Sequence, residues 1–274
     1  KIMFKQIYQT LIIMSVATGL ALPELGHAHS LEGIISGEHR SDANKARDPY
    51  RHPQQTLEFF GLQEDMTVVE IWPSGGWYAE IIAPYLNESG QYISAGYDPN
   101  DEVKYFRDRA AEFFDRLNQD PDLYSNVRHT VLKLPNRIEI AESNSADMVV
   151  TFRNIHNWMG SDQADAVFEG FFRVLKPGGV LGVVEHRGDP AVSQDPAAES
   201  GYVNQEYAIA LAEKAGFIFE TSSEINANPK DTKDHREGVW TLPPTYSSLN
   251  DQEKKSYADI GESDRFTLKF RKPE

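Results

Sequence analysis

The stretch VVEIWPSGGWY, residues 68–78, has the pattern of a β-strand that turns sharply into an α-helix. Residues 67–71 are mostly apolar and β-branched, which is typical of a strand. Gly75 and Gly76 would let the backbone of the turn pass close to a ligand, and a helix beginning near Trp77 would direct free N–H groups toward it. A glycine pair alone fits an ordinary turn equally well, so other parts of the sequence are needed to distinguish a ligand-binding turn from an ordinary one.

The alternation of strands and helices continues to the end of the chain. The run 180–185 is almost purely apolar and suits a central parallel strand buried on both faces. The segment 265–270 alternates in polarity as an edge strand does. We predict strands over residues 67–71, 92–97, 127–132, 147–151, 180–185, 217–225 and 265–270, and helices around residues 78–85, 102–117, 163–175 and 204–215.

Strands and helices that alternate in this way, joined by right-handed crossovers, form a doubly wound sheet. We therefore expect an α/β fold with a mostly parallel seven-stranded sheet. A helical cover over residues 29–61, ending at Gly61 as a C-cap, precedes the main domain over residues 62–274.

Residues 1–28 have the pattern of a signal peptide. Lys1 and Lys5 precede an apolar run over residues 11–22, and Gly26-His27-Ala28 offers small residues for cleavage. The run is shorter than the roughly 20 residues that span a bilayer, so a transmembrane anchor is the weaker alternative. We expect cleavage after Ala28, export to the periplasm or the extracellular space, and no stable membrane insertion of the mature protein.

Charge and cysteine content exclude several classes of function. The chain has 42 acidic and 27 basic residues among 274, a formal net charge of −15, with the acids scattered along its length. Nucleic-acid binding needs a basic face, so we do not expect a nucleic-acid partner. There is no cysteine, which excludes a disulfide framework, a thiolate zinc site and a cysteine nucleophile.

Asp98 points to the kind of ligand that the turn would bind. Ligands of open α/β sheets bind at the carboxyl ends of the strands, where the strand order reverses. Asp98 ends the second predicted strand about 28 residues after Glu70, a place where a carboxylate can accept both hydroxyls of a ribose. Asp98 could instead cap a helix before Pro99. With the glycine turn it favours an adenosine-containing ligand, either a dinucleotide or S-adenosylmethionine.

Beyond these features, the sequence resembles class I S-adenosylmethionine-dependent methyltransferases. The resemblance covers roughly residues 54–270 and rests on Glu70 to Gly76, Asp98, Asp147 at the fourth strand, and the motif LKPGG at 175–179. The stretches RHPQQTLEFFGL, VVEIWPSGGWYAEIIAPYL and EINANPKDTKDHREGVWTLPP look like a bacterial group of exported predicted methyltransferases. The resemblance implies an antiparallel seventh strand, a methyltransferase-like domain over 62–274, and S-adenosylmethionine as cofactor.

The resemblance also implies roles for individual residues. Glu70 would organise the turn around the methionine part of the cofactor, and Asp98 would bind the ribose. The family has glycine where this chain has Trp72 and Ser74, which brings the usual cofactor pose into question. The residues implied to bind the cofactor are Glu70, Trp72, Pro73, Gly75, Gly76, Asp98, Arg153 and Asn154.

Candidates for the chemistry lie in three polar clusters, 153–158, 186–187 and 226–236, just beyond predicted strand ends. Methyl transfer needs a positioned nucleophile and, where that nucleophile is protonated, a base. His156 and His186 are the leading candidates for a general base because imidazole titrates near neutrality, although each could simply satisfy backbone groups. Arg187 could bind an anionic substrate group or form a salt bridge. Residues 51–52 in the helical cover could act as part of a lid.

We expect no metal site, because the considered residues lack the close spacing of known ligand motifs; these are His156, His186, Asp231 and His235. The leading hypothesis is therefore methyl transfer from S-adenosylmethionine to a small molecule. One alternative is a non-catalytic module that binds an adenosyl ligand, and another is a nucleotide-linked oxidoreductase. The methyl acceptor and the oligomeric state do not follow from the sequence.

Overall fold

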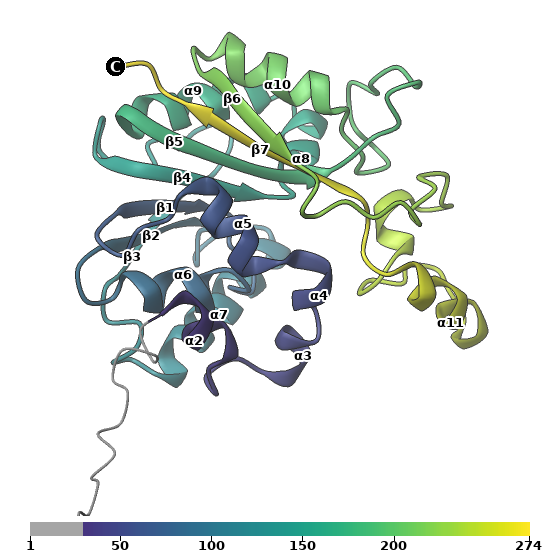
Figure 1. The fold of residues 1–274 in the computed structure, drawn as a ribbon, viewed down its shortest axis with the longest axis horizontal. Coiled ribbons are helices and arrows are strands. Elements are labelled where there is room, and N and C mark those ends of the chain that lie inside the picture. The colour runs from purple at the N-terminus through teal and green to yellow at the C-terminus, as the bar shows by residue number, and fades with distance from the viewer. Residues whose placement is uncertain (1–29) are drawn as a thin grey trace, which may run out of the picture.

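The computed structural model describes residues 30–274, so the predicted signal peptide over 1–28 lies outside the described residues. Helices and strands alternate along the chain (Figure 1). The strands are β1 (Thr67–Ile71), β2 (Gln91–Gly96), β3 (Val127–Val131), β4 (Ala146–Phe152), β5 (Leu175–His186), β6 (Ile218–Ser223) and β7 (Arg265–Arg271). The helices are α2 (Leu31–Ser36), α3 (Asp42–Lys45), α4 (Asp48–Arg51), α5 (Pro53–Phe60), α6 (Ala79–Leu86), α7 (Lys104–Gln119), α8 (Ile155–Gly160), α9 (Ala164–Val174), α10 (Gln205–Lys214), η1 (Gly238–Thr241, a 3-10 helix) and α11 (Asp251–Ile260).

The seven strands form one sheet in the order β3-β2-β1-β4-β5-β7-β6. The pairs from β3 to β5 are parallel, and β7 runs antiparallel to both β5 and β6. This topology confirms the predicted doubly wound α/β fold with an antiparallel last strand. Because the order reverses between β1 and β4, the carboxyl ends of these two strands flank the place where ligands of such sheets bind.

The prediction that residues 265–270 form an edge strand is wrong. Strand β7 lies between β5 and β6, and the side chains of Phe266, Leu268 and Phe270 are fully buried. Thr267, which alternates with them, is also buried and accepts a hydrogen bond from the side-chain amide of Asn226. The alternation therefore reflects one face with apolar contacts and one face with polar contacts. The edge strand on this side of the sheet is β6, whose residues are mostly exposed.

Helices cover both faces of the sheet, as Figure 1 shows. One face is packed by α8, α9 and α10, with Trp158, Phe168 and Phe171 in its hydrophobic core. The other is packed by α2, α5, α6 and α7, with Phe60 and Phe113 in a second core. Burial on both faces explains why β1, β4 and β5 are near-continuous apolar runs.

Helix α5 makes a close contact between the helical cover and the sheet. A Cβ atom on Gly182 in β5 would lie 2.7 Å from ring atoms of Phe60, so only glycine leaves room for this ring. The helix ends at Gly61, whose φ of 87° is the left-handed C-cap that the sequence predicts. The cover is further fixed by Arg40, which donates to Glu80 at 2.8 Å from a fully buried side chain.

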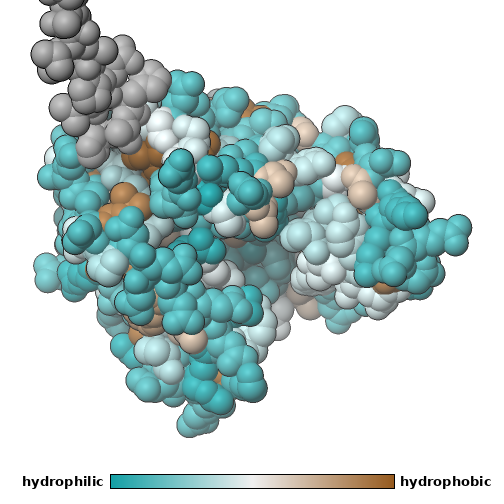
Figure 2. All heavy atoms as spheres, turned by 90° about the horizontal axis from the view of Figure 1, so that it is seen from below, coloured by the Kyte–Doolittle hydropathy of each residue, from teal (hydrophilic) through white to brown (hydrophobic). Residues whose placement is uncertain are grey.

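A lobe between β6 and β7 carries η1 and α11 and extends away from the sheet (Figure 1). Helix α11 was not predicted, although Asn250 and Glu253 form the capping box at its start. The face seen in Figure 2 is largely hydrophilic and is hollowed between the main body and this lobe. Among residues 30–274, no helix has the length and apolar character needed to cross a membrane.

Candidate functional site

Two adjoining cavities lie at the carboxyl ends of β1, β2 and β4. The larger has a volume of about 430 Å³ and the smaller about 190 Å³. They share four wall residues, Trp72, Tyr97, Tyr105 and Asn157. Together they form one elongated cleft, which we call the β1–β4 cleft, at the position where the strand order reverses.

The turn after β1 has the strained backbone of a glycine-rich loop without the glycines. Trp72 has a φ of 45° and Ser74 a φ of 53°, in the left-handed region that costs about 1–2 kcal/mol per L-residue. The Trp72 indole donates a hydrogen bond of 3.0 Å to the carbonyl of Leu132, so the ring is fixed beside the end of β3. Such strain persists where the surrounding contacts over-determine it, commonly at functional sites.

Gly75 and Gly76 lie against α7. The carbonyl of Gly75 accepts a hydrogen bond of 2.6 Å from Arg116 Nε, and a Cβ on Gly76 would lie 2.9 Å from Arg116 Cδ. The glycines thus permit close packing of helix and turn. Helix α6 begins at Ala79 and not near Trp77, because residues 74–78 form successive turns.

The larger cavity combines acidic and apolar walls. Asp98 accepts from the backbone N–H of Asn100 at 2.9 Å, and its other oxygen lies 3.4 Å from Arg137. Asp101 pairs with Lys133 at 3.0 Å. Its apolar wall residues include Val103, Phe106, Leu132 and Leu134. The larger cavity therefore offers both hydrogen-bond acceptors and apolar surface to a ligand.

Glu70 lies in the smaller cavity, together with Pro73 and Ser74 of the turn. Its carboxylate is almost fully buried and accepts a hydrogen bond of 2.6 Å from the hydroxyl of Tyr92. Burial raises the pKa of Glu70 to about 7, against the opposing effects of Tyr92 and Arg153. The carboxyl group therefore changes charge near neutral pH.

Two guanidinium groups line the same cavity, Arg51 from the cover and Arg153 at the end of β4. Arg51 donates from Nε to Glu262 at 3.2 Å and lies 4.6 Å from the Trp77 ring centre. Burial lowers the pKa of Arg51 well below its ordinary value and lowers that of Arg153 to about 10, so Arg153 stays charged at pH 7. Within residues 30–274, the Arg153 side chain and the terminal nitrogens of Arg51 have no hydrogen-bonding partner. The cavity thus has unneutralised positive charge.

Asn154, also a wall of the smaller cavity, braces the strand ends. Its amide donates to the carbonyl of Ile71 at 2.9 Å and to the hydroxyl of Thr151 at 3.1 Å. The preceding Arg153 has a φ of 63° and bonds through its N–H to the Val184 carbonyl at 2.7 Å. This geometry directs the sequence-predicted pair into the cleft from the end of β4.

His156 and His186 lie side by side, with ring centres 5.4 Å apart, next to Glu185. His156 Nδ1 is 3.2 Å from Glu185 Oε1, and His186 Nδ1 is 2.5 Å from Ser263 Oγ. Burial, and then the neighbouring His156, lower the pKa of His186 well below its ordinary value. Neither histidine is among the residues that line the two cavities; His156 precedes the wall residue Asn157 in α8, and His186 ends β5.

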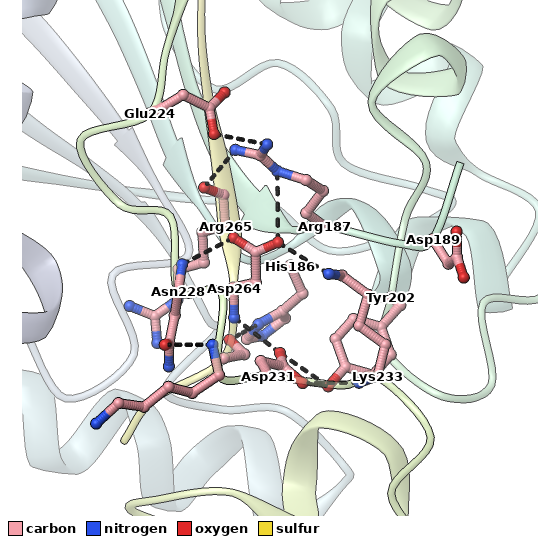
Figure 3. Close-up of polar contacts among 12 residues, drawn as sticks. His186, Arg187, Asp189, Tyr202, Glu224, Asn228, Asp231, Lys233, Asp264 and Arg265 are labelled. Carbon is pink, nitrogen blue, oxygen red and sulfur yellow. Dashed lines mark hydrogen bonds and ion pairs between the residues drawn. The ribbon is translucent and has the colours of Figure 1, made fainter. Parts of the chain in front are cut away.

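Arg187 is engaged in ion pairs. It contacts Glu224 at 2.7 Å and Asp264 at 3.7 Å, as Figure 3 shows, and donates to the carbonyl of Arg265. In the same network Asp231 accepts from Tyr202 at 2.8 Å. These contacts connect the loop after β6 to the ends of β5 and β7, so the geometry gives Arg187 a bracing position.

Asn157, from the predicted polar cluster 153–158, does line the cleft, but sequence reasoning missed several other wall residues: Tyr97, Asp101, Tyr105 and Lys133. Asp101 follows Asp98 by three residues, and an exposed pair, Val103 and Tyr105, follows it. A second acidic residue just beyond the end of a strand could have identified Asp101 as a wall residue. No sequence pattern identifies Lys133, because its position at the cleft depends on how the end of β3 lies against β2.

The sheet order and the cleft define the fold of class I S-adenosylmethionine-dependent methyltransferases. The chain is similar to a methyltransferase of Aquifex aeolicus described as S-adenosylmethionine-dependent, with a TM-score of 0.55, 15% identity, and coverage of 82% of this chain and 92% of that one. It is similar to phosphoethanolamine N-methyltransferase 2 of Haemonchus contortus in complex with S-adenosyl-L-methionine, with a TM-score of 0.53, 18% identity, and coverage of 90% and 58%.

The [4+2]-cyclase SpnF shares the fold as well, with a TM-score of 0.56, 17% identity, and coverage of 87% of this chain and 86% of that one. No protein-family model matches the sequence, and a search of curated proteins finds no match. The likeness establishes the fold. Since a cyclase also has this fold, the fold does not determine the reaction, which depends on the residues of the site.

Proposed function

We propose that the β1–β4 cleft binds S-adenosylmethionine and that the protein transfers its methyl group to a small molecule. The observation that carries the proposal is the division of chemistry between the two adjoining cavities. The larger has apolar walls and the carboxylate of Asp98, and the smaller has the carboxylate of Glu70 and two guanidiniums. These two sets match adenine with ribose, and a zwitterionic amino-acid group.

In the larger cavity, Val103, Phe106 and Leu134 would pack against the adenine. The Asp98 carboxylate would accept hydrogen bonds from the ribose hydroxyls, a role that needs an ionised acceptor at the end of β2. Its backbone bond to Asn100 uses only one lone pair of Oδ1. Enough acceptor capacity remains for two hydroxyls.

In the smaller cavity, the ionised Glu70 would accept from the methionine ammonium group, and Arg51 and Arg153 would donate to its carboxylate. Paired guanidinium and carboxylate groups form strong, directed hydrogen bonds. Such a carboxylate would neutralise positive charge that the described residues leave without a partner. Arg51 comes from the helical cover, which gives that cover a direct part in binding.

S-adenosylmethionine supplies an activated methyl group on a sulfonium, and the protein's residues need to place an acceptor in line with it. Asn154 and Asn157 occupy the end of the cleft nearest β4 and could orient the acceptor. His156 lies beside Asn157 in α8, but neither it nor His186 is among the wall residues of the cleft, so a general-base role for either histidine stays a prediction. The narrow volume of the cleft favours a small acceptor over a macromolecular one.

Titration calorimetry tests cofactor binding directly. We expect S-adenosylmethionine and S-adenosylhomocysteine each to bind at one site per chain with micromolar affinity, and NAD not to bind. Absence of binding by both adenosyl ligands would overturn the proposal. Binding without turnover of any acceptor in a broad screen would instead leave a non-catalytic adenosyl-binding module.

We also propose that the protein is exported and that residues 1–28 direct the export, on the basis of their charge and apolar pattern. Fractionation of cells that express the full chain tests this. Mature protein in the periplasm or the medium, beginning at His29, supports the proposal. Uncleaved protein in the cytoplasm contradicts it.

A further inference from the structure

His156, Glu185 and His186 form the one group of metal-ligand side chains that converges in the described part of the chain. One ligand atom from each lies within 4.8 Å of the other two. His156 is 7% exposed and Glu185 is fully buried. We infer that these three side chains bind a divalent transition-metal ion.

The spacing of the donors supports this inference. Ligands of a tetrahedral ion with bonds of about 2.0–2.2 Å lie about 3.4 Å apart. The Nδ1 atom of His156 is already 3.2 Å from Glu185 Oε1, which is close to that separation. The ligand atom of His186 lies within 4.8 Å of the other two, and binding of an ion would draw it to the same separation.

The surroundings of the three side chains also fit a metal site. Ligating histidines usually bond through their second ring nitrogen to a fixed neighbour, and ligating carboxylates are hydrogen-bonded in turn. His186 Nδ1 contacts Ser263 Oγ at 2.5 Å, which leaves Nε2 for an ion. Glu185 Oε2 accepts from the Ile155 N–H at 2.6 Å. Both positions are thus fixed by residues that would not bind the ion.

The donor set indicates which ions would bind. Two imidazoles and one carboxylate suit Zn²⁺ and Fe²⁺, whereas Mg²⁺ prefers oxygen ligands alone. The prediction of no metal site rested on His156 and His186 grouped with Asp231 and His235, and Glu185 was not included. Asp231 instead accepts from Tyr202, from His235 and from the Asp264 N–H, so it holds other parts of the chain together.

Calorimetry and metal analysis of the full chain with ZnCl₂ test the inference. We expect one Zn²⁺ per chain and at least 100-fold weaker binding of Mg²⁺. His156→Gln and Glu185→Gln should abolish Zn²⁺ binding. Ser263→Ala, which removes only the neighbour of His186, should weaken it 10- to 100-fold. His39→Gln, a change at a histidine bonded to the Glu80 carbonyl, should leave it unchanged.

Two outcomes would overturn the inference: no stoichiometric Zn²⁺ in the wild-type chain, or binding that survives both His156→Gln and Glu185→Gln. The wild-type measurement decides the question even if a variant fails to fold. S-adenosylmethionine binding, measured on the same samples, is independent of this result. Failure of the metal site therefore cannot be confused with failure of the proposed function.

Discussion

The hydroxyl of Tyr92 donates a hydrogen bond of 2.6 Å to Glu70 Oε2 at the base of the β1–β4 cleft. Both side chains are buried on adjacent parallel strands. The bond favours the ionised carboxylate, while burial favours the neutral acid and has the larger effect. The negative charge of Glu70 therefore reduces the stability of the fold. In the proposed function, the same charge binds the ammonium group of the cofactor.

We expect Glu70→Gln to stabilise the protein at high pH. The pKa of about 7 in the folded state exceeds the ordinary value of 4.5, so the folded protein binds this proton more tightly than the unfolded chain. Stability then falls as the pH rises from about 4.5 to about 7. The free energy of unfolding of the variant should exceed that of the wild type by up to about 3 kcal/mol at pH 8 and by little at pH 4.5. Urea unfolding at both pH values measures this.

Tyr92→Phe is the matched control for that experiment. It removes the hydrogen bond that favours the ionised form, so the pKa of Glu70 should rise further and the loss of stability should move to higher pH. A gain from Glu70→Gln that is equal at pH 4.5 and pH 8 would contradict the assigned titration.

Asp98→Asn should weaken S-adenosylmethionine binding about 10- to 100-fold. The amide keeps an oxygen for the Asn100 N–H but replaces the second acceptor with a donor, and hydrogen bonds to charged groups contribute about 1.5–3 kcal/mol. Asp115→Asn, on an exposed position of α7, should have no effect. Calorimetry on both variants measures the difference, and equal affinities would remove Asp98 from the ribose site.

Arg153→Met separates the two ends of the cleft. We expect it to weaken S-adenosylmethionine binding about 10-fold or more, because a charged hydrogen bond to the methionine carboxylate is lost. Adenosine alone, which has no carboxylate, should bind the variant and the wild type equally. Asp98→Asn should weaken both ligands. An equal loss for both ligands in Arg153→Met would place the arginine elsewhere in the binding mode.

The sequence predicted the fold because the patterns that determine it are local. Each strand of the parallel half is an apolar run, and LKPGG marks the entry to β5. The position of β7 did not follow from the sequence, because alternating polarity does not distinguish an edge strand from an inner one. Its burial comes from its place between β5 and β6 and from the core that Phe266, Leu268 and Phe270 share with the covering helices, contacts that leave no local pattern.

The candidate site was predictable to the extent that it lies at strand ends. Glu70, Trp72, Asp98, Arg153 and Asn154 all line the cleft. The sequence could not show, by contrast, whether Gly75 and Gly76 face a ligand or a helix; in the structure they contact Arg116 of α7. Contacts with distant segments, such as that of Glu262 with the cover, leave no pattern along the chain.

Gly182→Ala should destabilise the protein by about 1–3 kcal/mol. The added Cβ would lie 2.7 Å from the Phe60 ring, so α5 has to move away from the sheet, and overpacking of this kind costs that amount. Phe60→Leu in the same chain should recover part of the loss, because the two residues are in contact and their effects are not additive. Gly160→Ala is the control, since its Cβ would meet nothing nearer than 3.4 Å. Thermal unfolding measures all three.

Glu262→Gln should be the most destabilising of these substitutions, by about 3–5 kcal/mol at pH 7.5. Glu262 is buried and accepts hydrogen bonds from Arg47, Arg51 and Arg265, and removing one partner of a buried ion pair leaves the other charges uncompensated. The three arginines hold its pKa far below the ordinary 4.5. The stabilisation is therefore complete above pH 4.5 and is lost as the pH falls below it.

The difference between Glu262→Gln and the wild type should accordingly shrink as unfolding is measured from pH 7 toward pH 3. Glu220→Gln, which breaks partly exposed pairs with Arg271 and Lys269, should cost less than about 1 kcal/mol. Because Arg51 reaches from Glu262 into the smaller cavity, Glu262→Gln should also weaken S-adenosylmethionine binding, whereas Glu220→Gln should not. Unchanged binding in a folded Glu262→Gln variant would mean that the helical cover acts in stability alone.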